Sequence, residues 1–296
     1  QVGRLESPSI LRLEIREDAR KHVMLRKVTP HARDEFYARL RERVAESSQK
    51  DLFVFVHGYN VTFEDAARRT AQIAYDLKFP GAAVFFSWPS QGGLLKYKVD
   101  ESNVQWTVPH LKQFLLEVAE NSGASAVNLV AHSMGNRALT DALRQLRYEM
   151  REEVLFHQVV LAAPDIDADV FRRDIAPAIR PTARRVTLYA SSDDQALIAS
   201  KNVHGYPRAG DSGSGLVVIP GVETIDVSGI DTSLLGHSYY GSSHSILADL
   251  YEVIRRAQPP SARQWLHPMP WEGLTYWRLQ PENDEVAQPN RDTQQY

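Results

Sequence analysis

A serine that could act as a nucleophile stands in the pentapeptide Ala-His-Ser-Met-Gly at residues 131–135. An apolar, strand-like run comes directly before it, and a run with helical periodicity comes directly after it. A sharp turn between a strand and a helix, called a nucleophile elbow, holds its serine in a strained conformation and requires small neighbours. Gly135 meets this requirement, and Ala131 departs only slightly from the usual glycine. We therefore expect Ser133 to be a nucleophile rather than the N-cap of a buried helix.

A serine hydroxyl is a weak nucleophile at neutral pH and needs a base within hydrogen-bond reach. Five histidines follow Ser133 in the sequence: His157, His204, His237, His244 and His267. His237 falls in a loop after the last strand-like run and is preceded by the flexible Gly236. His244 comes shortly afterwards, in the first turn of the closing helix. His237 is the preferred base, and His244 remains the alternative.

The histidine needs a carboxylate that orients its ring, and this acid is expected just after the end of a strand. Asp193 and Asp194 follow the strand-like run at residues 186–190. Asp194 stands directly before an expected helix start, and Asp193 could simply cap that helix. Asp165 and Asp167, which follow the strand before, are the alternative acids.

From about residue 50 onward, short apolar runs alternate with runs of helical periodicity. The apolar runs are Leu52–His57, Ala82–Ser87, Ala126–Ala131, Gln158–Ala163, Val186–Ala190 and Thr224–Ser228. Most lack strict alternation, which is typical of strands buried on both faces of a parallel sheet. The helical runs are Glu64–Lys78, Val108–Asn121, Met134–Arg147 and Ile246–Arg256. This order predicts an α/β fold with a doubly wound, mostly parallel sheet.

These segments together resemble proteins of the α/β-hydrolase fold, in particular a bacterial, esterase-like or lipase-like group catalogued as a domain of unknown function. The matching stretches are residues 55–60 (FVHGYN), 131–135 (AHSMG), 163–167 (APDID), 189–196 (YASSDDQA) and 236–240 (GHSYY). The resemblance covers roughly residues 50–256. It implies the chain order serine, acid, histidine, with the acid after the strand at 186–190 and the base in the loop that holds His237.

The resemblance also implies the activity. A catalytic triad of Ser133, His237 and Asp194 would make the chain a serine carboxylic-ester hydrolase that works through an acyl-enzyme without a cofactor. Residues 164–185 are too few for a large cap domain, so we expect small or short-chain ester substrates. A thioesterase, amidase or acyltransferase would use the same residues, because the triad fixes the chemistry and the pocket fixes the substrate. A non-catalytic binding scaffold is the alternative from another class.

Acyl transfer further requires N–H donors, the oxyanion hole, for the negative charge of the tetrahedral intermediate. In this fold one donor is the backbone of the residue after the nucleophile, Met134, and the other comes from the loop after the first core strand, at Tyr59. Gly58 would let this backbone approach the serine closely. We expect His57 to order the loop through a hydrogen bond rather than to act as a base.

Composition excludes several other classes of protein. The 296 residues include 34 Lys and Arg against 37 Asp and Glu, so no basic stripe for a nucleic-acid partner is expected. No stretch approaches the roughly 18 to 20 apolar residues that span a membrane. There is no cysteine, which excludes thiolate metal sites and cysteine nucleophiles, and no histidine pair has zinc-binding spacing. Oligomeric state and compartment, cytoplasm or export after processing, stay open.

The chain is expected to be one catalytic core at residues 50–256 with two appended ends. Residues 1–49 form an N-terminal extension with possible strands at Ile10–Ile15 and His22–Leu25 and a helix from Pro30 to about Glu46. Residues 257–296 are rich in Pro and hold three of the five Trp: Trp265, Trp271 and Trp277. This composition predicts an extended segment that packs on the core.

Overall fold

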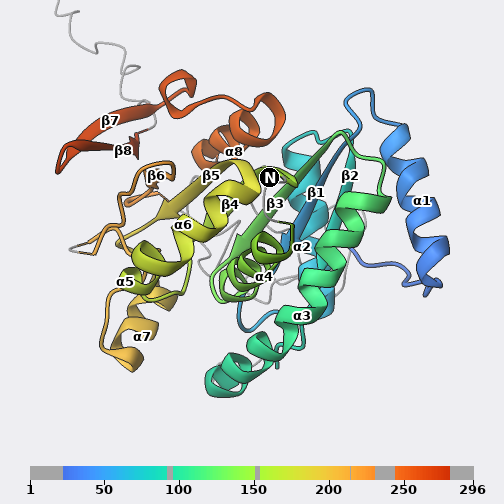
Figure 1. Cartoon of the computed structure of the whole chain (residues 1–296), viewed down its shortest axis with the longest axis horizontal. Helices are drawn as coiled ribbons and strands as arrows, with labels where there is room; N and C mark the ends of the chain where they lie inside the picture. Colours follow the sequence, from blue (N-terminus) through green and yellow to red (C-terminus); the bar gives the residue numbers. More distant parts are fainter. Residues whose placement is uncertain (1–22, 92–95, 151–153, 214, 231–243, 281–296) are drawn as a thin grey trace, which may run out of the picture.

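The computed structural model describes residues 23–91, 96–150, 154–213, 215–230 and 244–280. Within these residues an eight-stranded sheet has the strand order β2-β1-β3-β4-β5-β6-β8-β7 (Figure 1). The strands are β1 (Asp51–Val56), β2 (Ala82–Phe86), β3 (Ala126–His132), β4 (Phe156–Ala162), β5 (Ala183–Ala190), β6 (Glu223–Asp226), β7 (Leu266–Trp271) and β8 (Leu274–Leu279). Neighbouring strands are parallel, except that β7 is antiparallel to β8. The predicted mostly parallel sheet is confirmed.

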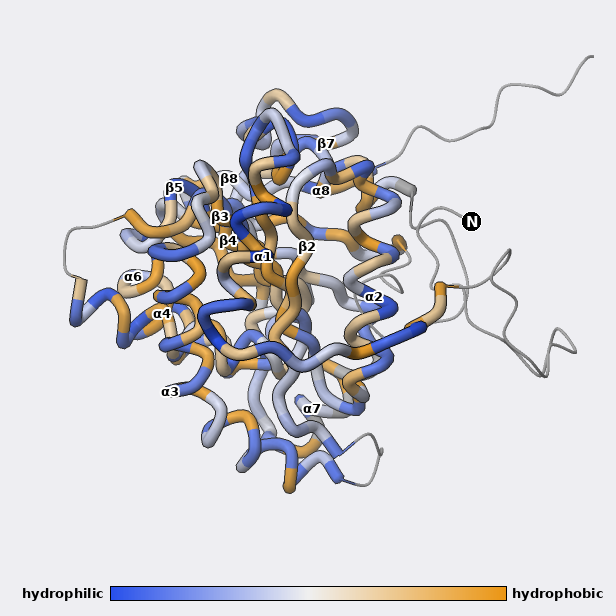
Figure 2. Tube along the Cα trace, turned by 90° about the vertical axis from the view of Figure 1, so that its right-hand side faces the viewer, coloured by the Kyte–Doolittle hydropathy of each residue, from blue (hydrophilic) through white to orange (hydrophobic). Residues whose placement is uncertain are grey.

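Helices cover both faces of the sheet (Figures 1 and 2). One face packs against α1 (Arg33–Ala45), α3 (Tyr97–Asn121), α4 (Gly135–Met150) and α6 (Ala176–Ile179). The other face packs against α2 (Phe63–Asp76) and α8 (His244–Arg256). The remaining helices are α5 (Ala168–Val170), α7 (Gln195–His204), a π-helix (Phe171–Ile175) and 3-10 turns at Arg180–Thr182 and Pro260–Ala262. The sheet is therefore doubly wound, as the alternation of the sequence predicts.

Strand β1 illustrates why its sequence is continuously apolar. Leu52, Val54 and Val56 point to the core beneath α3 and α4, whereas Phe53 and Phe55 point to the core beneath α2 and α8. All five side chains are buried. Since side chains alternate between the two faces of a strand, a strand covered on both faces loses the apolar–polar alternation of a half-exposed one.

Two helices, α3 and α1, begin three or more residues away from the positions that the sequence predicts. Helix α3 starts at Tyr97 rather than Val108, and Pro109 lies inside it. Pro is typical of the first turn of a helix, but here the preceding turns are held by buried contacts of Val104 and Val108. Helix α1 starts at Arg33 rather than Pro30. The described part of the predicted strand at residues 22–25 is not a strand, and the predicted strand at 10–15 lies outside the described residues.

The C-terminal segment does more than pack on the core, because its described part extends the sheet. Strands β7 and β8 form a hairpin, and β8 pairs with β6 at Ile225↔Trp277 and Asp226↔Arg278. The turn residues Glu272 and Gly273 both have positive φ, at 46° and 81°, as a two-residue hairpin requires. Two prolines hid β7 in the sequence, and an edge strand tolerates them because its outer N–H groups need no partner.

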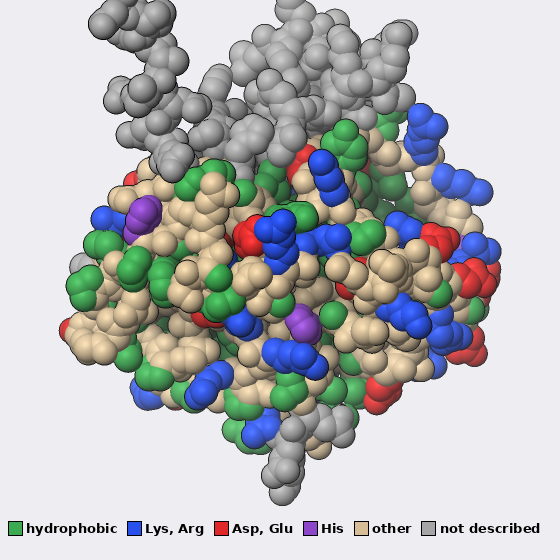
Figure 3. Space-filling model, turned by 90° about the horizontal axis from the view of Figure 1, so that it is seen from above, with side chains coloured by type: hydrophobic (Ala, Val, Ile, Leu, Met, Phe, Trp, Pro, Cys, Tyr) green, Lys and Arg blue, Asp and Glu red, His purple; other side chains and the backbone are tan. Residues whose placement is uncertain are grey.

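Parallel pairing carries the ends of β1, β3, β4, β5 and β6 to one edge of the sheet. This edge lies toward α7 and the first turns of α3 in Figure 1. The opposite side is seen from above in Figure 3, where acidic and basic side chains are interspersed. Among the described helices, none has both the length and the apolar character needed to cross a membrane. Functional sites of such sheets lie at the carboxyl ends of the parallel strands, which here are the ends of β1, β3, β4, β5 and β6.

Candidate active site

The predicted nucleophile, Ser133, lies in a tight turn between β3 and α4. Its φ angle is 50°, a region that non-glycine residues occupy at a cost of about 1–3 kcal/mol and mainly at functional sites. The Ser133 N–H donates to the carbonyl oxygen of Ala162 at 3.0 Å. The Asn136 side-chain amide donates to the carbonyl oxygens of Ser133 and Ala162, both at 3.0 Å. The strained conformation is thus held by neighbouring backbone. We call residues 131–136 the nucleophile turn.

Two glycines allow this turn to pack against the end of β1. A Cβ atom on Gly135 would lie 2.3 Å from the carbonyl oxygen of His57, a distance that no side chain can adopt without moving the backbone. A Cβ atom on Gly58 would lie 3.0 Å from the Cβ of Ser133 and 2.9 Å from Nδ1 of His132. The loop after β1 therefore runs directly beside Ser133. The backbone of Tyr59, a candidate oxyanion donor, follows this contact, and Met134, the other candidate, is buried at the start of the turn into α4.

His57 orders the loop that carries Tyr59. Its Nε2 accepts from the N–H of Trp88 at 3.1 Å, and its Nδ1 lies 2.9 Å from the carbonyl oxygen of Gly58, so Nδ1 carries the proton. The imidazole stacks on the Trp88 ring at 5.2 Å between centroids. Burial lowers the pKa of His57 from its ordinary value of 6.5 to about 4. Both nitrogens are engaged, which leaves the imidazole to hold the loop.

The preferred acid, Asp194, follows β5 at the same edge of the sheet and is 7% exposed. Its Oδ1 accepts from the N–H of Leu197 at 3.1 Å, so Asp194 rather than Asp193 makes the capping contact at the start of α7. Asp193 is exposed and accepts from the N–H of Gly229 at 2.6 Å. The burial of Asp194 and its place after β5 suit the predicted role of orienting a histidine.

Asp165, the alternative acid, is surrounded by donors of other kinds. Its Oδ2 accepts from the Tyr97 hydroxyl at 2.6 Å and from Nη2 of Arg137 at 3.1 Å. Its Oδ1 accepts from the Ser200 hydroxyl at 2.5 Å and lies 3.2 Å from Nε of Arg208. These four donors fill the acceptor positions of the carboxylate. Asp167, the other alternative, caps α5 by accepting from the N–H groups of residues 169 and 170.

The histidine positions are only partly described. His237 and the loop around it lie outside the described residues, and His244 is the first residue of α8. His204 is described, at the end of α7: its Nε2 is 2.8 Å from Glu101, and its Nδ1 is 2.8 Å from the carbonyl oxygen of Ser200. Both His204 nitrogens are therefore engaged by acceptors of the protein.

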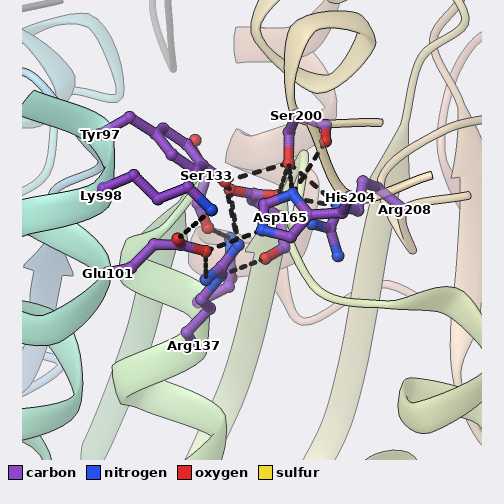
Figure 4. Close-up of polar contacts among 10 residues, drawn as sticks. Tyr97, Lys98, Glu101, Ser133, Arg137, Asp165, Ser200, His204 and Arg208 are labelled. Carbon is purple, nitrogen blue, oxygen red and sulfur yellow. Dashed lines mark hydrogen bonds and ion pairs between the residues drawn. The ribbon is translucent and has the colours of Figure 1, made fainter. Parts of the chain in front are cut away.

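A polar cluster beside Ser133 was not found from the sequence (Figure 4). It consists of Tyr97, Glu101, Arg137, Asp165, Ser200, His204 and Arg208, which we call the Asp165 cluster. Arg137 bridges two carboxylates, Glu101 at 2.8 Å and Asp165 at 3.1 Å. Burial raises the pKa of Glu101, but the hydrogen bonds from Arg137 and His204 outweigh it and lower this pKa overall. Burial and the charge of Asp165 raise the pKa of Tyr97 well above 10, so this hydroxyl stays a donor.

The Asp165 cluster directly contacts the nucleophile turn and the loop that holds Gly58 and Tyr59, which we call the oxyanion loop. The Tyr97 ring packs edge-on against the Tyr59 ring, with centroids 5.3 Å apart. The backbone N–H of Asp165 lies 3.4 Å from the carbonyl oxygen of Ser133. A local sequence motif does not predict the Asp165 cluster, because its residues come from segments far apart in the sequence. Among the described residues, no group of three or more His, Cys, Asp or Glu side chains is placed to hold a metal ion.

The sheet order, the helices on both faces and the serine in a strained strand-to-helix turn define an α/β hydrolase. The chain belongs to the family described as "Alpha/beta hydrolase of unknown function (DUF900)", whose model matches residues 32–256. A search of curated proteins found no significant match.

Solved structures with a similar fold are distant. A predicted CIB-like hydrolase from Thermoplasma acidophilum shares 14% identity, with 71% of this chain and 88% of that one covered and a TM-score of 0.42. An uncharacterized protein from Bacillus cereus shares 12% identity, with 78% and 64% covered and a TM-score of 0.43. Esterase B from Lactobacillus rhamnosis shares 11% identity, with 63% and 74% covered and a TM-score of 0.33. Likenesses this distant say nothing about the substrate.

Proposed function

We propose that the protein is a serine carboxylic-ester hydrolase with Ser133 as nucleophile, His237 as general base and Asp194 as the acid that orients it. Oγ of Ser133 attacks the ester carbonyl carbon while His237 takes the hydroxyl proton. The N–H groups of Tyr59 and Met134 stabilise the oxyanion. Collapse of the intermediate expels the alcohol, which takes the proton back from the imidazolium. A water molecule, activated by the same histidine, then releases the acid and restores Ser133.

One observation carries this proposal: the positive φ of Ser133 in a turn packed against the loop of Gly58. A buried serine that only capped a helix would need no such strain and no glycine approaching its Cβ. Helix α4 begins at Gly135, so the positive end of its dipole lies near the serine and favours negative charge there. These features support an acyl-transfer nucleophile over a binding scaffold.

The choice of Asp194 is supported by what the competing carboxylates already do. Four donors occupy the acceptor positions of Asp165, and none of them is a histidine. Asp167 is engaged at the start of α5. Asp194 is buried and follows the end of β5, and its Oδ1 caps α7. A carboxylate in this situation can accept a hydrogen bond from an imidazole and stabilise its cation.

The short connection between β4 and β5 supports small substrates. Residues 163–182 form only short helical segments, with no inserted domain over the edge of the sheet. The expected outcome with p-nitrophenyl esters is highest kcat/KM for short acyl chains and no activation by an interface. A preference for long chains that rises above the critical micelle concentration would contradict it. Activity should also rise with pH through an apparent pKa near 7, as the histidine loses its proton.

The decisive experiment is labelling with a fluorophosphonate followed by intact-mass measurement. The parent chain is expected to gain a single adduct, and Ser133→Ala to gain none. Ser47→Ala is the matched control, because Ser47 is also a buried serine but lies before β1 and hydrogen-bonds to Asp51. It should label like the parent. A folded parent chain without an adduct would mean that Ser133 is not activated, and the protein would then be a binding scaffold.

A further inference from the structure

We propose that Asp165 is a positioning residue: it holds the nucleophile turn, the oxyanion loop and the start of α7 in register around the candidate site. This inference rests on the proposed function for its meaning but on separate contacts for its support. The carboxylate is 2% exposed and receives donors from four different parts of the chain. Tyr97 belongs to α3, Arg137 to α4, Ser200 to α7, and Arg208 to the segment after α7.

Each of these contacts leads to a candidate catalytic group. Tyr97 donates to Asp165 and supports the ring of Tyr59, whose backbone is a candidate oxyanion donor. Arg137 directly follows the nucleophile turn on α4, and its Nε donates to the backbone oxygen of Asp165 at 2.6 Å. The Asp165 N–H lies 3.4 Å from the carbonyl oxygen of Ser133. Asp165 therefore contacts Tyr97 and Arg137 through its carboxylate and the Ser133 carbonyl oxygen through its backbone.

The same carboxylate fixes the helix that begins beside the preferred acid. Ser200 of α7 donates to Asp165 at 2.5 Å, and His204 at the end of α7 contacts Glu101 at 2.8 Å. Asp194 caps the other end of this helix through the N–H of Leu197. Because a helix moves nearly as a rigid rod, anchoring Ser200 and His204 also limits where Asp194 can lie.

The charge of Asp165 matters because two guanidinium groups pair with it, the buried one of Arg208 and the half-buried one of Arg137. Arg208 is 4% exposed, its Nε contacts Ser200 and Asp165, and its buried Nη2 has no hydrogen-bond partner among the described residues. Arg137 is shared between Asp165 and Glu101. In the described part of the chain Asp165 is the carboxylate that pairs with Arg208. Neutralising it removes this counter-ion, and an uncompensated buried charge forces its surroundings to rearrange. The rearrangement would reach the site through Tyr97 and Ser200.

The test compares Asp165→Asn with Asp249→Asn. Asp249 is a matched control because it is also buried and also bonds to a tyrosine and an arginine, Tyr189 and Arg263, but it lies on α8. Both variants should lose thermal stability. Asp165→Asn should lower kcat for p-nitrophenyl acetate about 10- to 100-fold, because small misplacements of catalytic groups cost this much, with KM changed less than about threefold. Asp249→Asn should keep kcat within about twofold.

Two results would overturn the inference. Equal kcat in both variants would mean that Asp165 only stabilises the fold. A loss of about a thousandfold with a changed pH profile in Asp165→Asn, but not in Asp194→Asn, would mean that Asp165 is itself the catalytic acid. If Asp165→Asn does not fold, Tyr97→Phe and Ser200→Ala each remove one donor and should still lower kcat by a few-fold. Unchanged kcat in both would equally contradict the proposal.

A separate readout covers the case in which the proposed function fails. If the parent chain gives no fluorophosphonate adduct and hydrolyses no ester, hydrogen–deuterium exchange still tests the positioning. Asp165→Asn should speed exchange at residues 56–60, 133–137 and 195–204 together, and Asp249→Asn should leave these segments at the parent rate. If exchange in Asp165→Asn became faster only at residues next to Asp165 in the sequence, the inference would be contradicted.

Discussion

The two sides of the candidate site are built in opposite ways. The nucleophile turn is held by close backbone contact: Gly58 and Gly135 remove side chains so that the end of β1 touches the turn at Ser133. The Asp165 cluster, on the other side, is held by charged and hydroxyl side chains from α3, α4, α7 and the segment after it (Figure 4). The nucleophile turn thus depends on glycines that carry no side chain, and the Asp165 cluster depends on paired charges.

This difference predicts how each side responds to mutation. A close backbone contact at a glycine is lost when a side chain is added. A new Cβ atom 2.3 Å from a backbone oxygen forces the backbone to move, which costs stability. A network of paired charges fails when a charge is removed, because its partners stay buried without compensation. The nucleophile turn should therefore respond mainly in stability. The Asp165 cluster should respond in activity as well.

The largest expected effect separates the proposed catalytic acid, Asp194, from the Asp165 cluster. Asp194→Asn should lower kcat by about a thousandfold or more, because the histidine then loses the partner that orients it. Asp193→Asn is the control, since Asp193 is exposed and lies one residue away. It should stay within a few-fold of the parent in p-nitrophenyl acetate hydrolysis. A reversed order would assign the acid to Asp193.

The next effect is on stability. Gly135→Ala should destabilise the fold by more than about 3 kcal/mol in urea unfolding, or prevent folding, because its Cβ would meet the His57 carbonyl at 2.3 Å. Gly213→Ala is the control, since its Cβ would meet only the end of the Asp211 side chain, at 3.1 Å. It should cost less than about 1 kcal/mol. Similar costs for both would mean that the turn is not close-packed.

The same contrast explains what the sequence could and could not predict. The strained turn at Ser133 could be predicted because its neighbours are consecutive in the chain and the strain restricts them to small residues. The strands of the core were found because burial on both faces makes each a short apolar run. Information of this kind is local, and one sequence is enough to read it.

The Asp165 cluster could not be found in that way. Tyr97 and Asp165 are separated by 68 residues, and Ser200 and Asp165 by 35. Asp165 drew attention only as an alternative acid, and Tyr97 fell before the predicted start of α3. Which charged side chains meet depends on the packing of helices, which periodicity does not specify. The hairpin of β7 and β8 was missed for a related reason: its partner β6 is distant, and its prolines do not look like a strand.

The third prediction concerns the pH dependence of stability. It tests whether the neutral His57 imidazole helps to hold the loop that packs against the nucleophile turn. Its pKa of about 4 in the folded protein lies below the ordinary value of 6.5. Stability from the neutral imidazole is therefore complete above pH 6.5 and is lost as the pH falls toward 4, by about 3 kcal/mol. Urea unfolding from pH 7 to pH 4 should show this loss in the parent relative to His57→Gln. Parallel curves for the two chains would mean that His57 has the same pKa in the folded and unfolded protein.

The smallest effect measures how strongly the cluster is coupled. Tyr97→Phe removes one hydrogen bond to a charged acceptor, worth about 1.5–3 kcal/mol. In a double-mutant cycle, adding it to Asp165→Asn should cost less than it does alone, because the acceptor is already weakened. The exposed pair Arg173–Asp174, 2.7 Å apart, is the control and should show no measurable coupling. Additive effects at Tyr97 and Asp165 would mean that their bond carries no energy of its own, and the cluster would then be a set of independent contacts.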